Sequence, residues 1–164
     1  MRVRETARQI KGITRRDALA GATAVVLVPA VPDRVRATPE ELAGAIKDIV
    51  GTAVLKSGRV KLTMPELAEN GNSVSLSIAI DSPMTAADHV KIIHVLSEMN
   101  PITTVARFHL GPRAGRAKVA TNIRLATTQT VTAIAEMSDG SFCSGTANVV
   151  VTLAACIEGT IEKE

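Results

Sequence analysis

The sequence predicts an all-β domain, an antiparallel β-sandwich preceded by one short helix, in a chain of 164 residues. Three observations support this fold class. Beyond residue 57, apolar residues recur at every second position in several segments, which is typical of strands with one buried face. Turn dipeptides separate these segments at intervals of roughly ten residues. One segment, before residue 52, has clear helical spacing, and no repeat or linker divides residues 38–164, so we expect a single domain.

The expected helix covers residues 38–51. Thr38 is a good N-cap, Pro39 suits the first helical position, and Glu41 completes a capping box with Thr38. Gly51 fits the position where a helix ends. Apolar residues at three- and four-residue steps give the helix one apolar face, formed by Leu42, Ala45, Ile46, Ile49 and Val50.

Four segments alternate clearly and are expected to be strands: residues 59–64, 73–80, 119–125 and 149–153. Residues 91–99 fit a helix or a strand, and the neighbouring strands favour a strand. Turn signals occur at Asn70-Gly71, Asn100-Pro101, Gly111-Pro112 and Asp139-Gly140. The residues expected in the core are Val74, Leu76, Ile78, Ile123, Val149, Val151 and Leu153.

The N-terminal segment 1–37 differs in charge from the rest of the chain. It contains eight Lys/Arg and three Asp/Glu, whereas residues 38–164 contain eleven Lys/Arg and thirteen Asp/Glu. Its basic start is followed by an uncharged stretch, 18–31, which is shorter than the ~20 residues of a membrane span. This layout predicts an export signal, and Arg15-Arg16 indicates the twin-arginine type. We expect cleavage after Ala37, or else after Ala30, and a periplasmic protein; the alternative is an uncleaved amphipathic helix.

Nucleic-acid and membrane partners are not expected. The body of the chain has no basic excess, and Phe108 and Phe142 are its only aromatic residues. A nucleic-acid-binding domain needs a basic patch, and single-strand binding also needs aromatic faces for base stacking.

Two cysteines, Cys143 and Cys156, could carry chemistry. A disulfide between them is one possibility in an oxidising compartment, but it requires the chain to double back near Ser144-Gly145. Otherwise Cys143 is a small packing residue, and Cys156, just beyond the last strand, is available to other proteins. No Lys, Arg or His adjoins Cys156 in sequence to favour its thiolate, so we do not expect a self-sufficient nucleophilic enzyme.

No metal site or cofactor is expected. His89, His94 and His109 are the only histidines, and their spacing matches no ligand motif. A metal-binding protein that uses these histidines with Met84 or Met99 is a weaker alternative. No nucleophile elbow or phosphate-binding glycine loop is present.

Five stretches in series suggest a family. They are residues 69–72 (Glu-Asn-Gly-Asn), 81–84 (Asp-Ser-Pro-Met), 108–116 (Phe-His-Leu-Gly-Pro-Arg-Ala-Gly-Arg), 135–142 (Ala-Glu-Met-Ser-Asp-Gly-Ser-Phe) and 149–156 (Val-Val-Val-Thr-Leu-Ala-Ala-Cys). With them the chain resembles the SoxY family, the sulfur-carrier subunits of the periplasmic thiosulfate-oxidising (Sox) system.

The resemblance implies an immunoglobulin-like sandwich over residues 38–153 and a carrier arm over 154–164. It implies a heterodimer with a SoxZ-like subunit. It also implies that Cys156 is the covalent attachment point for inorganic sulfur compounds, which separate Sox enzymes load, hydrolyse and oxidise. The chain would then be a carrier and not an enzyme.

The arm departs from the family pattern. SoxY-like chains carry Gly-Gly-Cys-Gly-Gly, whereas Ala154, Ala155 and Ile157 surround Cys156 here. Alanine is stiffer than glycine, and Ile157 adds bulk beside the sulfur. The alternative function is therefore a non-carrying immunoglobulin-like adaptor subunit of a SoxYZ-like heterodimer.

Overall fold

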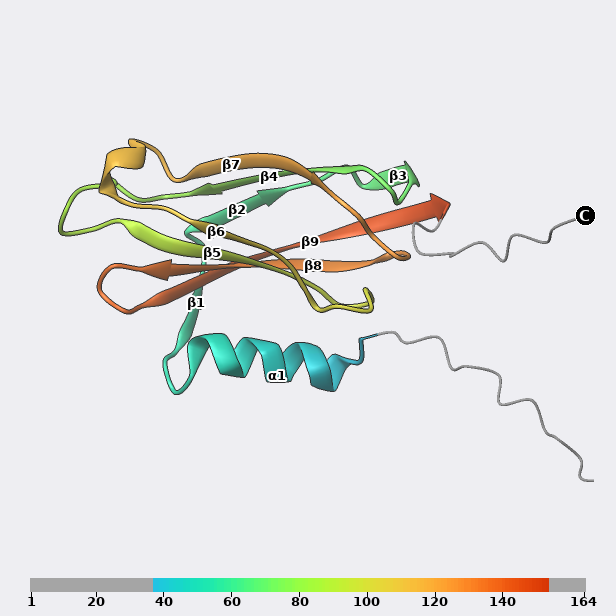
Figure 1. Cartoon of the computed structure of the whole chain (residues 1–164), viewed down its shortest axis with the longest axis horizontal. Coiled ribbons are helices and arrows are strands. Elements are labelled where there is room, and N and C mark those ends of the chain that lie inside the picture. Colours follow the sequence, from blue (N-terminus) through green and yellow to red (C-terminus); the bar gives the residue numbers. More distant parts are fainter. Residues whose placement is uncertain (1–36, 154–164) are drawn as a thin grey trace, which may run out of the picture. The chain divides into compact units, whose positions relative to one another are not determined.

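The computed structural model describes residues 37–153, which fold into two packed β-sheets with a helix against one of them (Figure 1). The elements are α1 (Pro39–Val50), β1 (Leu55–Ser57), β2 (Val60–Thr63), β3 (Leu67–Asn70), β4 (Val74–Ile80), β5 (Val90–Ser97), β6 (Thr104–His109), η1 (Pro112–Ala114), β7 (Lys118–Ile123), β8 (Gln129–Met137) and β9 (Phe142–Leu153).

The helix α1 begins and ends where the sequence predicts. The Glu41 amide donates to the Thr38 hydroxyl at 3.2 Å, and the Glu41 carboxylate accepts from the Thr38 amide at 2.9 Å. Pro39 occupies the first turn, and Gly51 closes the helix with a positive φ of 62°. Ala37, directly before the N-cap, is buried, and its amide donates to the Asn100 carbonyl.

The smaller sheet has the strand order β2-β4-β7, and the larger has β1-β9-β8-β5-β6 with β3 also paired to β9. Pairing is antiparallel except that β1 and β3 run parallel to β9. Residues 55–70 run in the same direction as β9, and their middle part, β2, crosses to the other sheet. The predicted β-sandwich is confirmed, with these two parallel pairings as the difference, because an alternating pattern specifies a buried face and not the direction of a neighbour.

The main core lies between the two sheets and confirms most of the expected core residues. Val74, Leu76, Ile78, Ile123 and Val149 are all buried. Val151 is only partly buried, and the expectation for Leu153 is wrong, because its exposed fraction is 66%. The pairing of β9 with β8 ends at Val149, so the end of β9 extends beyond the core.

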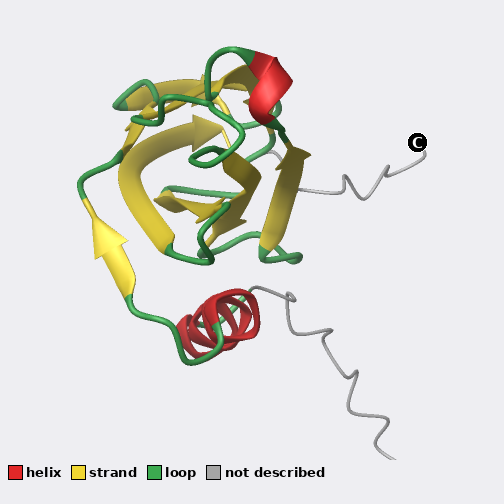
Figure 2. Ribbon diagram, turned by 90° about the vertical axis from the view of Figure 1, so that its left-hand side faces the viewer, coloured by secondary structure: helices red, strands yellow, loops and turns green. Residues whose placement is uncertain are grey.

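A second apolar cluster lies on the outer face of the larger sheet, beneath α1. Leu96 of β5 and Ile134 of β8 are fully buried there, together with Val50 of the helix. Figure 2 shows the helix beside the end-on sandwich, apart from the space between the two sheets. The central strands β5 and β8 therefore contact apolar residues on both faces.

Residues 91–99 were expected to be a strand, and β5 confirms this. Residues 1–36 of the predicted signal segment 1–37, with Arg15 and Arg16, and the predicted arm 154–164 lie outside the described residues. Within residues 37–153, no helix is long and apolar enough to cross a membrane.

Candidate functional site

The end of β9, residues 150–153, is the base from which the C-terminal segment leaves the domain, and we call it the tail root. These residues pair with β3 on one side, where the Val150 amide donates to the Glu66 carbonyl at 2.9 Å. On the other side, the Val151 amide donates to the Thr128 hydroxyl at 2.9 Å. This side chain takes the place of a backbone partner, because the pairing of β9 with β8 ends at Val149. The tail root is therefore hydrogen-bonded on both sides.

The last residue of β9 is also held in place. The Leu153 carbonyl accepts from the Gly71 amide at 2.8 Å, and the Gly71 carbonyl accepts from the Leu125 amide at 2.8 Å. The Thr152 hydroxyl donates to the Glu69 carbonyl at 2.8 Å. These bonds connect the tail root to the turn before β4 and to the loop after β7.

The tail root carries apolar side chains in contact with solvent. Val150 and its register partner Leu67 are 50% and 57% exposed, on one face of the β3–β9 pair. Leu153 lies on the opposite face by the strand alternation, beyond the end of the core.

The predicted attachment residue Cys156 and its neighbours Ala154, Ala155 and Ile157 lie outside the described residues. Cys156 comes three residues after Leu153 in the sequence, so its Cα can lie at most ~11 Å from that of Leu153. The structure thus fixes the starting point of the segment that carries this thiol.

Cys143 lies at the opposite end of β9. It is buried, with 1% exposure, and pairs with Ala135 of β8 and Lys56 of β1. Because β9 is one continuous strand, Cys143 and Leu153 are separated by ~33 Å, and three further residues can recover only ~11 Å. A disulfide needs Cα atoms within ~7 Å, so the intrachain disulfide that the sequence left open is ruled out by the length of β9. The expectation that Cys143 is a packing residue is confirmed.

The histidines belong to no group of three or more described His, Cys, Asp or Glu side chains that could hold a metal ion. His94 is buried on the outer face of the larger sheet, and its Nδ1 accepts from Arg107 Nε at 3.2 Å. Its Nε2 is buried without a hydrogen-bond partner among the described residues. Burial and the Arg107 charge lower the pKa of His94 below 6.5, despite an opposing effect of Glu136, so the ring is held neutral. His89 lies in the loop before β5, where its Nδ1 is 3.0 Å from the Thr85 carbonyl.

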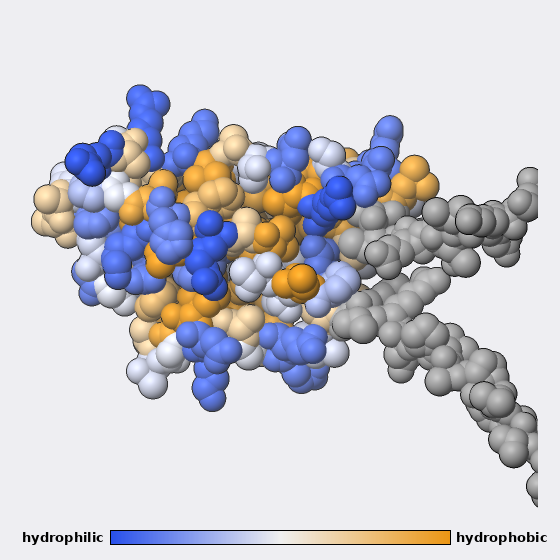
Figure 3. Space-filling view, viewed as in Figure 1, coloured by the Kyte–Doolittle hydropathy of each residue, from blue (hydrophilic) through white to orange (hydrophobic). Residues whose placement is uncertain are grey.

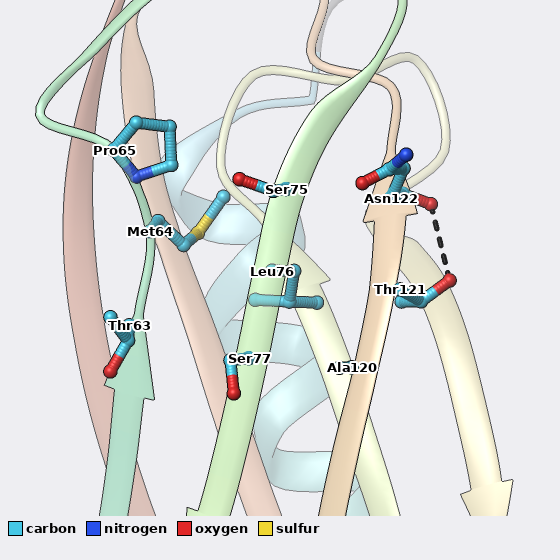
Figure 4. A pocket seen from close by; sticks show the side chains of 9 residues that line it. All are labelled: Thr63, Met64, Pro65, Ser75, Leu76, Ser77, Ala120, Thr121 and Asn122. Carbon is cyan, nitrogen blue, oxygen red and sulfur yellow. Dashed lines mark hydrogen bonds between the residues drawn. The ribbon is translucent and has the colours of Figure 1, made fainter.

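One hollow lies on the smaller sheet. It is lined by short side chains such as Thr63, Ser75, Ser77 and Asn122 from β2, β4 and β7 (Figure 4). Its lining includes hydroxyl groups but no acid, base or thiol, so no side chain in it is placed to activate a hydroxyl as a nucleophile.

A second hollow, which we call the edge groove, lies between β6 and β7 and has a volume of about 610 Å³. Apolar side chains contribute much of its lining, including Ile102, Val105, Phe108 and Ile123. Arg124 lies at the end nearest the tail root, next in sequence to Leu125.

Comparison with known protein families shows which family the chain belongs to. Residues 46–156 match the family model described as sulfur oxidation protein SoxY. The chain belongs to the SoxY family. The matched stretch includes the whole sandwich from β1 onward and ends at Cys156, so residues 157–164 lie beyond it. No curated protein matches the chain.

Solved structures share the fold. The sulfur carrier protein SoxY from Chlorobium limicola f. thiosulfatophilum is 24% identical, with a TM-score of 0.58 over 70% of this chain and 98% of that one. A superoxide reductase (neelaredoxin) from Ignicoccus hospitalis is 16% identical, with a TM-score of 0.51 over 71% and 95% of the two chains. The superoxide reductase from Nanoarchaeum equitans is 12% identical, with a TM-score of 0.50 over 58% and 100%.

The superoxide reductases raise the question of a metal centre in this sandwich. Within residues 37–153, no group of three or more His, Cys, Asp or Glu side chains is arranged to hold a metal ion. His94 Nδ1 is occupied by Arg107, and Cys143 is enclosed in the core. The described donors therefore do not fit such a centre.

Proposed function

We propose that this chain is a periplasmic sulfur carrier of the Sox system, in which Cys156 holds oxidation intermediates covalently while separate enzymes act on them. In this role the chain is a substrate carrier and not an enzyme. Its signal segment 1–37, with Arg15-Arg16, would direct it to the periplasm.

The observation that carries the proposal is that β9 buries Cys143 at its start and is exposed at its end, three residues before Cys156 in the sequence. Cys143 is sealed in the sheet, whereas the tail root fixes the start of the segment with Cys156 at the far end of the same strand. A thiol on a short tether keeps its cargo at high effective concentration for each enzyme that docks on the domain. Membership of the SoxY family supports the same role.

The chemistry needs partners. Joining Cys156 Sγ to the terminal sulfur of thiosulfate forms one S–S bond and releases the thiol proton and two electrons, which a partner redox enzyme takes up. Hydrolysis of the S–SO₃ bond then releases sulfate and a proton and leaves a persulfide on the cysteine. No described residue is required for either step beyond holding the tether.

We also propose that the chain forms a heterodimer with a SoxZ-like subunit. Family membership supports this partner. Co-expression with a SoxZ-like chain should give a 1:1 complex in size-exclusion chromatography, and a persistent monomer would count against it.

The carrier role is tested on protein isolated from the periplasm of cells grown on thiosulfate. Intact-mass analysis should show sulfur-bearing adducts that a reductant removes, and peptide mapping should place them on Cys156. Cys156→Ser should abolish the adducts and change the free energy of unfolding by less than ~0.5 kcal/mol, as expected for a residue outside the core.

The control is Cys143→Ala, which should keep the adducts. Adducts on Cys143, or none on either cysteine in protein from thiosulfate-grown cells, would contradict the carrier role. A stable SoxZ-like complex without adducts would instead favour the non-carrying adaptor. N-terminal sequencing of the same sample should find a start within a few residues of Thr38; retention of Met1 would contradict export with cleavage.

A further inference from the structure

The edge groove lies between two strand edges that are unpaired within the described part of the chain. β6 is the last strand of the larger sheet and pairs only with β5, and β7 is the last strand of the smaller sheet and pairs only with β4. Free strand edges present backbone donors and acceptors in a row and readily accept another extended segment. β6 and β7 run across the face seen in Figure 1, and Figure 3 shows apolar surface between charged side chains on that face.

The groove combines apolar lining with one cation. Ile102, at its rim, is 74% exposed, and Val105 and Phe108 are only partly buried. The Arg124 side chain is exposed and belongs to no ion pair between described residues. An occupant with alternating apolar and acidic residues would complement both features.

The mouth of the groove is held near the tail root. Two backbone hydrogen bonds, Gly71 to Leu153 and Leu125 to Gly71, connect the tail root to the residue after Arg124. Each such step covers ~5 Å, so Leu153 and Leu125 are ~10 Å apart. Asn100, at the same end, bonds the Arg124 carbonyl at 2.9 Å and the Ala126 amide at 2.8 Å, which fixes the mouth.

The segment beyond Cys156 contains both apolar and acidic residues, which complement the groove. Ile157, Gly159 and Ile161 alternate with Glu158, Thr160 and Glu162. In a strand, this spacing would put Ile157 and Ile161 on one face and Glu158 and Glu162 on the other. Residues 154–164 contain three Glu and one Lys, opposite in charge to Arg124.

The length of the C-terminal segment also matches the distance that it must cover. Residues 154–156 can span the ~10 Å from Leu153 to the mouth. Residues 157–161 then extend over ~13 Å, the same length as the five residues of β6 from Thr104 to Phe108.

We propose that residues 157–161 dock in the edge groove as an added strand and hold Cys156 at its mouth, out of reach of reagents in solution. The occupant is this chain's own C-terminal segment. The apolar side chains Ile157 and Ile161 cover Val105 and Phe108, and Glu158 pairs with Arg124. In a carrier this would shield the sulfur until a partner enzyme displaces the segment, a consequence that rests on the proposed function, whereas the docking itself does not.

The test measures the rate at which N-ethylmaleimide alkylates Cys156 in the native chain ending at Glu164, followed by peptide mass mapping. Ile102→Asp should raise this rate about tenfold, as expected when a segment docked nine-tenths of the time is released. The matched control is Val54→Asp, since Val54 is 75% exposed but lies between α1 and β1, and it should leave the rate unchanged. Buried Cys143 should stay unreactive in every variant, which shows that the domain remains folded.

A double variant, Ile157→Asp with Ile161→Asp, should accelerate alkylation as much as Ile102→Asp does and should speed amide hydrogen exchange in β6 and β7. Equal alkylation rates in the parent chain and Ile102→Asp would overturn the docking. So would protection that increases with protein concentration, because a second copy would then fill the groove. Failure of the carrier role can be told apart from failure of the docking. In that case the sulfur adducts would be missing, while Cys156 would remain protected from N-ethylmaleimide.

Discussion

The two ends of strand β9 differ sharply in burial. At its start, Cys143 lies between β1 and β8 and is 1% exposed. At its end, Leu153 has β3 on one side and is 66% exposed, although the alternation of the strand continues unchanged. A strand can therefore pass from core to surface without any change in its own pattern, when its neighbours and the opposite sheet end before it does.

The two halves of β9 therefore have different structural roles. The first half anchors the domain, and Gly145 shows how closely it packs, since a Cβ there would clash with the Val60 carbonyl oxygen. The second half holds the base of the C-terminal segment by hydrogen bonds while leaving the side chains of Val150 and Leu153 exposed.

The largest expected effect comes from placing a charge in the first half. Val149→Asp would bury an unpaired carboxylate at a position with 0% exposure and should unfold the domain, because the cost is several kcal/mol, close to the whole stability. Val151→Asp, two residues further, should cost less because Val151 is only partly buried. Thermal unfolding of both variants measures this difference. Equal melting temperatures would contradict the claim that β9 has a buried first half and an exposed second half.

Gly145→Ala should come next. The added Cβ meets backbone atoms of Val60, which cannot rotate away, so the sheets must shift at a cost of about 1–3 kcal/mol. Gly111→Ala is the matched control, since nothing lies within 4 Å of its added Cβ and its φ of −158° is open to any residue. Urea unfolding of the two variants provides the comparison. An unchanged unfolding midpoint for Gly145→Ala would contradict the tight packing of residue 145 against the Val60 backbone.

Cys143→Ala should have a moderate effect. It removes a buried sulfur from the main core and should lower the free energy of unfolding by about 1–2 kcal/mol. Cys156→Ser should leave it within ~0.5 kcal/mol. Chemical denaturation measures both, and a larger loss for Cys156→Ser would mean that this residue belongs to the packed domain.

The smallest effect concerns pH. The folded-state pKa of His94 is lowered by burial, so below pH 6.5 the unfolded chain binds the proton more readily than the folded one. The stability from neutral His94 is complete above pH 6.5 and is lost as the pH falls below it. His94→Gln, which cannot be protonated, should flatten the decline in melting temperature between pH 7 and pH 5; an unchanged slope would assign the decline to other groups.

The sequence by itself determined the local features of this protein. The capping box of Thr38 and Glu41 fixes the start of α1, and the alternation in β2, β4 and β7 reveals strands with one buried face. It also singled out Cys156 through the series of motifs, and the family match ends at that residue. These features depend on residues a few positions apart, which a sequence displays directly.

Only the tertiary structure decided which elements lie beside each other. β8 was not predicted, although Val131, Ala133, Ala135 and Met137 alternate with Thr130, Thr132 and Glu136. Ile134 interrupts this pattern because it packs beneath α1 on the other face of the strand, a contact that the sequence pattern does not indicate. The exposure of Leu153, the Arg107–His94 contact and the edge groove depend in the same way on where neighbouring strands end. A sequence pattern records how many faces of an element are buried, whereas the identity and reach of its neighbours come from contacts between residues far apart in the chain.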